Sequence, residues 1–162
     1  MRLIIKQKVV SVAGKYFIKD REDRDVYVVK GSYTFPKKYR VFDMQDREIV
    51  KIKKKFFRIF FATFDFFVNG SRVCRAKRKF SIKPKYEIKG ATGEYTISGN
   101  FFEWDYSIKK GEQVVASVFK KLTLYRDSYI LDIEEGFEKE LPVILGITIM
   151  FDHVHHRSHL FS

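Results

Sequence analysis

The amino-acid sequence predicts a mainly β fold, a closed barrel of hairpins followed by one C-terminal helix. Three observations lead to this prediction. Most of the 162-residue chain alternates apolar and polar residues with period two and is rich in Val, Ile, Tyr and Phe, which is typical of strands with one buried face. Turn-forming residues separate these segments at short intervals. One apolar run near the C-terminus lacks the alternation.

The alternating segments occupy most of the first 133 residues. We expect strands at residues 2–8, 15–19, 26–35, 38–44, 48–55, 57–67, 72–82, 85–89, 94–98, 102–109, 113–121, 123–126 and 129–133. Asn69-Gly70, Lys110-Gly111 and the charged cluster 20–23 lie between pairs of these segments and have the composition of tight turns. About a dozen short strands joined by turns predict a sandwich or a barrel.

A recurring hairpin pattern favours the barrel. An aromatic-rich strand ending near Asp, a turn, and a second strand leading into Lys or Arg occur in YRVFDMQDREIVKIKKK, FDFFVNGSRVCRAKRKF and WDYSIKKGEQVVASVFKKL. The spacing between these units is irregular, which disfavours a solenoid or a propeller of fixed period. A closed barrel built from successive hairpins fits the pattern better.

The segment after the last strand is predicted to be a helix over about residues 138–155. Glu138 and Glu140 precede Pro142, so acidic groups lie near the positive end of the helix dipole and a proline lies in the first turn. The residues that follow are apolar on every face, which indicates a helix buried on all sides. A strand stays open as the alternative, because β-branched residues suit strands and Gly146 costs about 1 kcal/mol inside a helix.

Length and composition predict one cytoplasmic domain, residues 1–162, with barrel strands over about 2–133 and a histidine-rich tail at 156–162. The single cysteine, Cys74, has no partner for an internal disulfide, and the first residues, MRLIIKQKVV, lack the features of a signal peptide. The longest uncharged apolar run, residues 141–151, is shorter than the roughly 18 residues that cross a bilayer. We therefore expect no transmembrane span.

Positive charge is concentrated in one part of the chain. Residues 51–85 carry 12 basic residues and one acidic residue. At period two, Lys51, Lys53 and Lys55 share one face of a strand, while Arg75, Lys77 and Lys79 oppose Cys74, Ala76 and Phe80 on another. Two outward triplets of positive charge attract phosphate groups on lipid, nucleic acid or soluble anions. The alternative is that they are solvated strand faces that keep the protein soluble.

Several stretches resemble the LURP-one-related family of the tubby-like superfamily, which also includes the phospholipid scramblases. They are KYFIKD, KYRVFDMQDREIVKIKKKF, FSIKPKYEIKGATGEYTISGNFFEWDYSI, VVASVFKK and DSYILDIEEGFEKELPVILGITIMFD, and they span nearly the whole chain. The resemblance implies a closed twelve-stranded barrel threaded by the hydrophobic C-terminal helix. It also suggests an anionic ligand, since tubby-type relatives bind phosphoinositide headgroups through basic residues on the barrel exterior. FFATFDFF at residues 60–67 departs from the family pattern, as does the histidine-rich tail.

Four histidines lie within seven residues, at His153, His155, His156 and His159. On a continued helix the spacing brings them together in pairs one turn apart, which is an arrangement that zinc or copper accepts. Only Asp152 adds a carboxylate nearby, so the alternative is a solvated or partner-facing tail. The sequence leaves a metal site as an untested candidate and predicts no cofactor.

A second alternative is nucleic-acid binding through stacked rings. The candidates are Phe56, Phe57, Phe60, Phe61, Phe64, Phe66 and Phe67, which lie beside basic residues. A barrel wrapped around a helix also needs large side chains for its interior, and alternation would send about half of these rings inward. We therefore place nucleic acid behind anionic lipid as the expected partner.

No catalytic constellation is recognisable in the sequence, which has no nucleophile elbow, no glycine-rich phosphate loop before a helix and no paired cysteines. Cys74 lies between Val73 and Arg75 on an expected strand, where an inert packed thiol is favoured. We expect a non-enzymatic module that associates through its basic outer face with an anionic membrane surface or a phosphorylated ligand. Its expected location is the cytoplasm, including a peripheral position at the inner face of the membrane.

Overall fold

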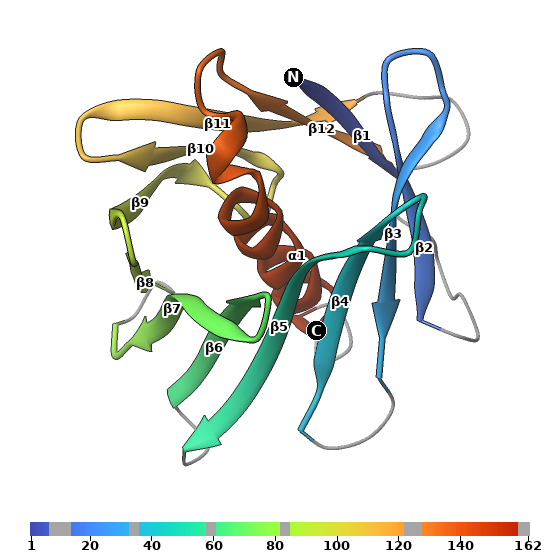
Figure 1. Ribbon diagram of the computed structural model, residues 1–162. Helices are drawn as coiled ribbons and strands as arrows, with labels where there is room; N and C mark the ends of the chain where they lie inside the picture. The colour runs from blue at the N-terminus through green and yellow to red at the C-terminus, as the bar shows by residue number, and fades with distance from the viewer. Residues whose placement is uncertain (7–13, 33–35, 58–60, 82–84, 122–127, 159–162) are drawn as a thin grey trace.

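The computed structural model describes residues 1–6, 14–32, 36–57, 61–81, 85–121 and 128–158. Twelve antiparallel strands form a closed barrel, and one α-helix runs through its interior (Figure 1). Each strand pairs with the next strand along the chain, and β1 pairs with both β2 and β12, which closes the ring. The predicted fold class is therefore confirmed.

The strands are short, and the turns between them match the turn chemistry of the sequence. Their bounds are β1 Arg2–Lys6, β2 Lys15–Lys19, β3 Asp25–Gly31, β4 Lys38–Asp43, β5 Glu48–Phe57, β6 Phe61–Val68, β7 Ser71–Lys79, β8 Lys85–Gly90, β9 Gly93–Asn100, β10 Asp105–Lys110, β11 Gln113–Lys121 and β12 Ser128–Ile133. A short 3₁₀ helix, η1 (Glu138–Glu140), leads into α1 (Leu141–Ser158). The strand expected at residues 123–126 lies outside the described residues.

One expected strand begins later than predicted. The segment 102–109 was expected to be extended throughout, but residues 101–104 form a turn and β10 begins at Asp105. The turn is held by its rings, because Phe101 stacks on Phe151 at 4.4 Å between centroids and Trp104 stacks on Tyr129 at 4.0 Å. Trp104 adopts a φ of 55°, a conformation that side chains of this size rarely adopt. Tertiary ring packing therefore overrides the local strand propensity here.

Helix α1 occupies the interior of the barrel. Every residue from Val143 to Asp152 is buried, so the helix has no solvent-facing side over this stretch. At Gly146 an added Cβ would lie only 2.9 Å from the ring of Phe66 on β6, so the missing side chain lets that ring pack against the helix backbone. The helix ends at Ser158, three residues beyond the predicted end, and therefore includes the first part of the histidine-rich tail.

The start of α1 is attached to the barrel wall by a polar contact. The Tyr95 hydroxyl on β9 donates to Glu140 Oε2, and Lys110 Nζ on β10 donates to Glu140 Oε1 at 2.6 Å. Lys110 also donates to the Thr92 hydroxyl at 2.8 Å in the β8–β9 turn. One carboxylate thus connects the entry of the helix to two neighbouring strands.

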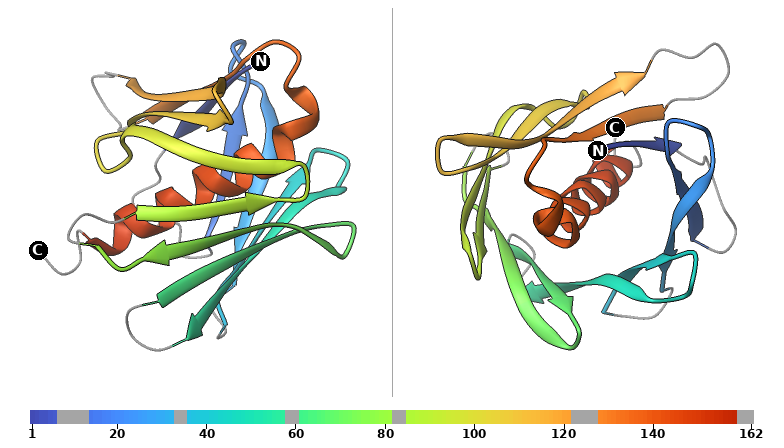
Figure 2. Two further views of the ribbon diagram at one scale, coloured as in Figure 1. Left: turned by 90° about the vertical axis from the view of Figure 1, so that its left-hand side faces the viewer. Right: turned by 45° about the horizontal axis from the view of Figure 1, so that its top comes forward.

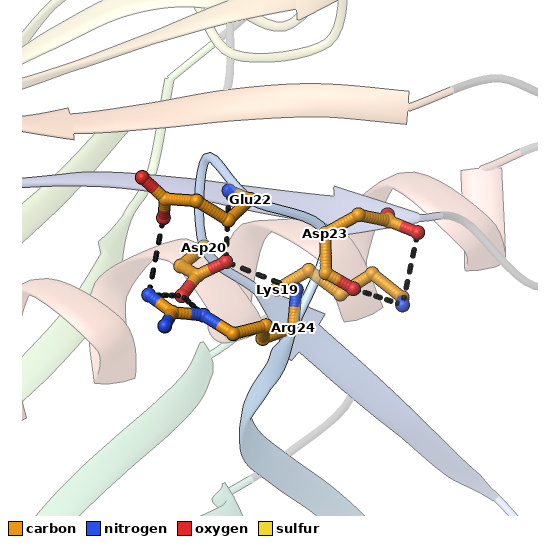
Figure 3. Close-up of polar contacts among 5 residues, drawn as sticks. All are labelled: Lys19, Asp20, Glu22, Asp23 and Arg24. Carbon is orange, nitrogen blue, oxygen red and sulfur yellow. Dashed lines mark hydrogen bonds and ion pairs between the residues drawn. The ribbon is translucent and has the colours of Figure 1, made fainter.

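The β2–β3 turn is closed by one aspartate and one arginine (Figure 3). Asp20 Oδ1 accepts the backbone N–H of Glu22 at 2.9 Å and of Arg24 at 3.0 Å, while Arg24 Nε donates to Asp20 Oδ2 at 2.7 Å. Asp23 supplies the positive φ of the turn, at 62°, and Lys19 Nζ lies 3.4 Å from its carboxylate. The charged cluster is therefore a turn, as predicted, and the Asp20 carboxylate accepts hydrogen bonds from backbone N–H groups of the same turn.

The β4–β5 turn repeats this geometry. Asp43 Oδ1 accepts the backbone N–H groups of Gln45 and Arg47, both at 2.9 Å, and Arg47 Nε donates to Asp43 Oδ2 at 2.7 Å. Asp46 has a φ of 60° at the position equivalent to Asp23. The sequences DREDR and DMQDR share both aspartates and the arginine, so the same residues at the same spacing form the same turn.

The two ends of the barrel differ in what they contain (Figure 2). The helix-entry end holds the start of α1 and the turns 20–25, 43–48, 68–71, 90–93 and 110–113. The helix-exit end holds the second half of α1, where Tyr86 on β8 meets Phe151 with ring centroids 5.3 Å apart. Strands β5 and β7 both end here, on the same side as the C-terminal end of the helix (Figure 2, left).

Candidate functional site

The two predicted lysine and arginine triplets lie on neighbouring parts of one wall, separated only by β6. Val50 and Ile52 are fully buried on the inner face of β5, which directs Lys51 and Lys53 to the outside. On β7, Cys74 and Ala76 are buried on the inner face, so the side chains of Arg75 and Lys77 point outward. With strands about 4.8 Å apart, the two triplets lie roughly 10 Å from each other.

Strand β6 places a carboxylate between the triplets. Asp65 lies opposite Lys53 on one side and Arg75 on the other. Arg75 donates two hydrogen bonds to Asp65, Nε to Oδ1 at 2.5 Å and Nη2 to Oδ2 at 2.9 Å, while Lys55 Nζ lies 3.1 Å from Oδ2. Burial opposes ionisation of Asp65, but the hydrogen bonds from Arg75 and Lys55 hold its pKa below the usual value. Lys55 and Arg75 are therefore partly neutralised.

Lys79 is also partnered. Its Nζ lies 2.7 Å from Oε2 of Glu87 on β8, and Lys89 approaches the other oxygen of the same carboxylate at 2.8 Å. The hydrogen bonds from Lys79 and Lys89 lower the pKa of Glu87 to about 2. Three of the six predicted ligand residues thus have an acidic partner.

The other three predicted residues have no acidic partner within the described part of the chain. Lys51 and Lys53 place their ammonium groups 5.7 and 5.4 Å from the centroid of the Phe67 ring, which lies half-buried on the outside of β6. Lys77 is exposed and forms no ion pair with a described residue. The charges of these three side chains are therefore not compensated by a described acidic residue.

Two further cations extend the surface, and the sequence reasoning missed both. Lys38 on β4 lies opposite Lys53, and the exposed Arg72 on β7 lies opposite Phe67. Neither forms an ion pair with a described residue. The pairing of β4 with β5 and of β6 with β7 brings these two cations to the site. Alternation within one strand does not reveal this pairing. We call the surface formed by Lys38, Lys51, Lys53, Arg72 and Lys77 the basic wall.

The phenylalanine-rich stretch divides between the two faces of the barrel. Phe64 and Phe66 are fully buried in the core, and Phe67 lies on the outside between Lys51 and Lys53. The side chains of Phe56, Phe57, Phe60 and Phe61 lie outside the described residues. The two core rings have no exposed face on which a base can stack.

Phe80 does not follow the alternation expected for β7. The period-two pattern predicted that Phe80 points inward with Cys74 and Ala76, and this prediction was wrong. Strand β7 ends at Lys79, and the Phe80 side chain is 86% exposed. Arg78, at the preceding inward position, is exposed as well, although Tyr86 opposite it on β8 packs on Phe151, so the last residues of β7 no longer follow the alternation.

Cys74 is packed within the barrel. It is 3% exposed, and burial raises the pKa of its thiol to about 12. A thiol with so high a pKa is almost entirely protonated at neutral pH. Only the deprotonated thiolate reacts, so Cys74 is expected to be inert.

The histidine cluster is only partly described. His153 is half-buried, and its Nδ1 shares a hydrogen bond with the Tyr39 hydroxyl on β4. The neighbouring Asp152 accepts a hydrogen bond from the Tyr16 hydroxyl at 3.3 Å. The side chains of His155 and His156, and all of His159, lie outside the described residues. Among the residues that are described, no three His, Cys, Asp or Glu side chains are grouped as a metal site, and the metal site stays a prediction.

Over the residues that were described, no helix is both long and apolar enough to cross a membrane.

Comparisons with known proteins give the relatives of the chain. The uncharacterized protein YxjI of Bacillus subtilis (strain 168) is 28% identical over 156 residues, which cover 95% of this chain and 93% of that protein. An X-ray structure of a protein from Arabidopsis thaliana has the same fold, with a TM-score of 0.62 and 16% sequence identity over 93% of this chain and 90% of that one. The LURP-one-related family model matches residues 1–152, the whole barrel and most of the helix within it. The chain therefore belongs to the LURP-one-related family.

Proposed function

We propose that this protein is a non-enzymatic module that associates through the basic wall with the phosphate groups of an anionic membrane surface or of a phosphorylated ligand. The observation that carries the proposal is the set of cations on one wall of the barrel, on β4, β5 and β7, that have no acidic partner among the described residues. Lys51, Lys53 and Lys77 belong to this set, and Lys38 and Arg72 flank them. Several uncompensated cations on one rigid surface create a local field that attracts phosphate.

The barrel gives this surface a fixed shape. The basic side chains start from hydrogen-bonded strands whose inner faces are filled by α1 and by core residues such as Ile52 and Phe66. The Cα atoms that carry the cations therefore hold a fixed spacing, while the lysine side chains can adjust to a ligand. The interior is occupied by the helix, so binding is assigned to the outside of the barrel rather than to its lumen.

Flotation with phospholipid vesicles tests the proposal. We expect the unmodified protein to float with vesicles that contain phosphatidylglycerol and not with pure phosphatidylcholine, with binding that weakens as salt rises. A variant with Lys51, Lys53 and Lys77 changed to Gln should bind on the order of 100-fold more weakly, since each cation near the surface contributes about 1 kcal/mol. Its melting temperature should hardly change, because exposed charges add little stability.

A charge-matched control separates a placed surface from net charge. Arg21, Lys109 and Lys139 also form no ion pair with a described residue, and they lie away from the basic wall. Changing these three to Gln removes the same charge and should weaken vesicle binding far less. Equal losses in both triple variants would mean that only net charge matters.

Two further experiments identify which kind of molecule supplies the phosphate groups. Titration with inorganic pyrophosphate tests a soluble phosphorylated ligand, and gel shift with single- and double-stranded oligonucleotides tests nucleic acid. Binding to oligonucleotides without binding to phosphatidylglycerol vesicles would replace the lipid proposal with the nucleic-acid alternative. If the protein binds neither anionic vesicles, nor pyrophosphate, nor oligonucleotides, the proposed function is refuted.

A further inference from the structure

Phe80 is the most exposed large apolar side chain in the described part of the chain. It is 86% exposed, against 48% for Met44 and 43% for Met1. It follows directly after the end of β7, at the helix-exit end of the barrel, whereas Met1 and Met44 lie at the helix-entry end. Single exposed apolar side chains are common on protein surfaces, so the meaning of this ring depends on the residues around it.

The residues around Phe80 are cationic. Lys77, Arg78, Lys79 and Lys85 are all exposed, and Lys79 lies opposite Lys85 in the β7–β8 pair. Lys79 is compensated by Glu87, but the other three form no ion pair with a described residue. An apolar ring surrounded by cations matches the interface of an anionic bilayer, where negative headgroups lie just above the apolar region.

The two ends of the barrel carry opposite kinds of charge. The described acidic residues of the helix-entry end include those of turns 20–25 and 43–48 and the segment 134–140. The helix-exit end carries Lys77, Arg78, Lys79 and Lys85 around Phe80, beside the acidic residues Glu87 and Glu103. A negatively charged surface therefore attracts one end of the barrel and repels the other, which gives the protein a preferred orientation.

We propose that Phe80 inserts into the interfacial region of an anionic bilayer, with the helix-exit end of the barrel facing the membrane. This inference rests on the proposed function, since the basic wall supplies the attraction that brings the protein to the surface. Lys77 belongs to the basic wall and to the surroundings of Phe80, so this approach brings Lys77 and Phe80 into contact with lipid together, while Arg72 stays near the opposite end of β7. Phe80 adds an apolar anchor that the electrostatic proposal does not require.

The first test uses Phe80→Ser, which removes the ring and leaves every charge in place. We expect binding to phosphatidylglycerol vesicles to weaken by about tenfold, and the loss to persist at high salt because it is apolar in origin. Met44→Ser is the matched control, an exposed apolar residue at the opposite end, and should bind like the unmodified protein. Both variants should keep the melting temperature of the unmodified protein, since neither side chain is buried.

The second test reports insertion directly. Phe80→Trp places a fluorophore at the proposed anchor, while the natural Trp104 is 4% exposed and stacked on Tyr129. With anionic vesicles we expect a blue shift of the emission and quenching by brominated phosphatidylcholine, and Met44→Trp should show neither.

The outcomes separate the two proposals. If the protein binds vesicles but Phe80→Ser binds equally well and Phe80→Trp stays unshifted, the insertion is refuted while the proposed function stands. If Phe80→Trp responds to oligonucleotides and not to vesicles, the ring stacks on bases and the membrane anchor is refuted. If the unmodified protein binds pyrophosphate but no anionic vesicle, the insertion is refuted while the proposed function stands for a soluble phosphorylated ligand. If it binds neither probe, both proposals are refuted.

Discussion

At the scale of single residues, Asp65 pairs with two of the six cations predicted as ligands, Lys55 and Arg75. Its side chain is fully buried between Arg75 and Lys55, although it belongs to the outer face of β6. The carboxylate orders these two cations and reduces their charge at the same time. Two residues that the sequence suggests as ligands are therefore held in a structural ion pair, and the proposed attraction to phosphate falls to the cations beside them.

We expect Asp65→Asn to lower the free energy of unfolding by about 1–3 kcal/mol at pH 7, because the partners of a buried group lose their hydrogen bonds. The hydrogen bonds from Arg75 and Lys55 lower the pKa of Asp65. The stability that it adds is thus complete above its unfolded pKa of about 3.9 and is lost as the pH falls through the lower folded value. Urea denaturation should show the difference in free energy of unfolding between the two proteins shrinking below about pH 4. A difference independent of pH would contradict this account.

The same variant should bind anionic vesicles more tightly, because it releases Arg75 and Lys55 from their acidic partner. Flotation at pH 7 measures this change. Weaker binding by Asp65→Asn would mean that ordering of these side chains matters more than their charge.

Cys74 gives a second prediction at this scale. Burial raises the pKa of its thiol to about 12, so the native protein should react with a thiol reagent at pH 8 only as fast as the barrel opens. In denaturant the reaction should become rapid. Fast labelling of the native protein would show that the thiol is accessible and ionised.

At the scale of elements, the packing of α1 against β6 depends on Gly146. Helix propensity alone favours alanine at this position by about 1 kcal/mol. The Phe66 ring occupies the space that a Cβ would need, at 2.9 Å from the nearest ring atom. The glycine that weakens the sequence case for a helix is therefore what allows the helix and the strand to approach closely.

We expect Gly146→Ala to destabilise the protein by about 1–3 kcal/mol, because overpacking of the core outweighs the gain in helix propensity. Phe66→Leu should cost less in the Gly146→Ala background than alone, since the smaller side chain makes room for the methyl group. A double-mutant cycle by chemical denaturation measures this coupling. Additive effects would show that the two residues do not compete for the same space.

At the scale of the whole molecule, the barrel and the helix share a single core. Residues from the inner faces of the strands pack around α1, and Ile144, Ile147 and Met150 are completely buried among them. The helix has no second hydrophobic surface on which to rest, and the barrel without it would have an unfilled interior. The two are expected to fold together.

Ile147→Asp tests this dependence. A charge buried without a partner costs several kcal/mol, comparable with the total stability of a domain, so the variant should fail to fold. Ile147→Val is the control and should cost only about 0.5–1.5 kcal/mol. Circular dichroism during heating distinguishes the two. A soluble Ile147→Asp variant that melts cooperatively would contradict the interior position of the helix.

The sequence alone was enough to predict the class of fold and most strands. Period-two alternation is a local property that each strand carries within itself, and Asn69-Gly70 or the two aspartate–arginine turns form from residues close in the chain. The closed twelve-stranded barrel with its threaded helix came from the family resemblance, since periodicity alone leaves a strand open for residues 141–151. Local patterns thus identify elements, while their closure into a ring depends on contacts between distant segments.

The composition of the candidate site was harder to predict from the sequence than the class of fold, because it depends on the tertiary structure. Alternation correctly placed Lys51 and Lys53 on the outside, but the register of four strands, β4 to β7, brought Asp65 against Arg75 and Lys55 and added Lys38 and Arg72. Alternation also failed for Phe80, because a strand's period does not show where the barrel wall ends. Which charges remain uncompensated, and which ring meets water, are set by neighbours far apart in the chain. Only the folded barrel brings those neighbours together.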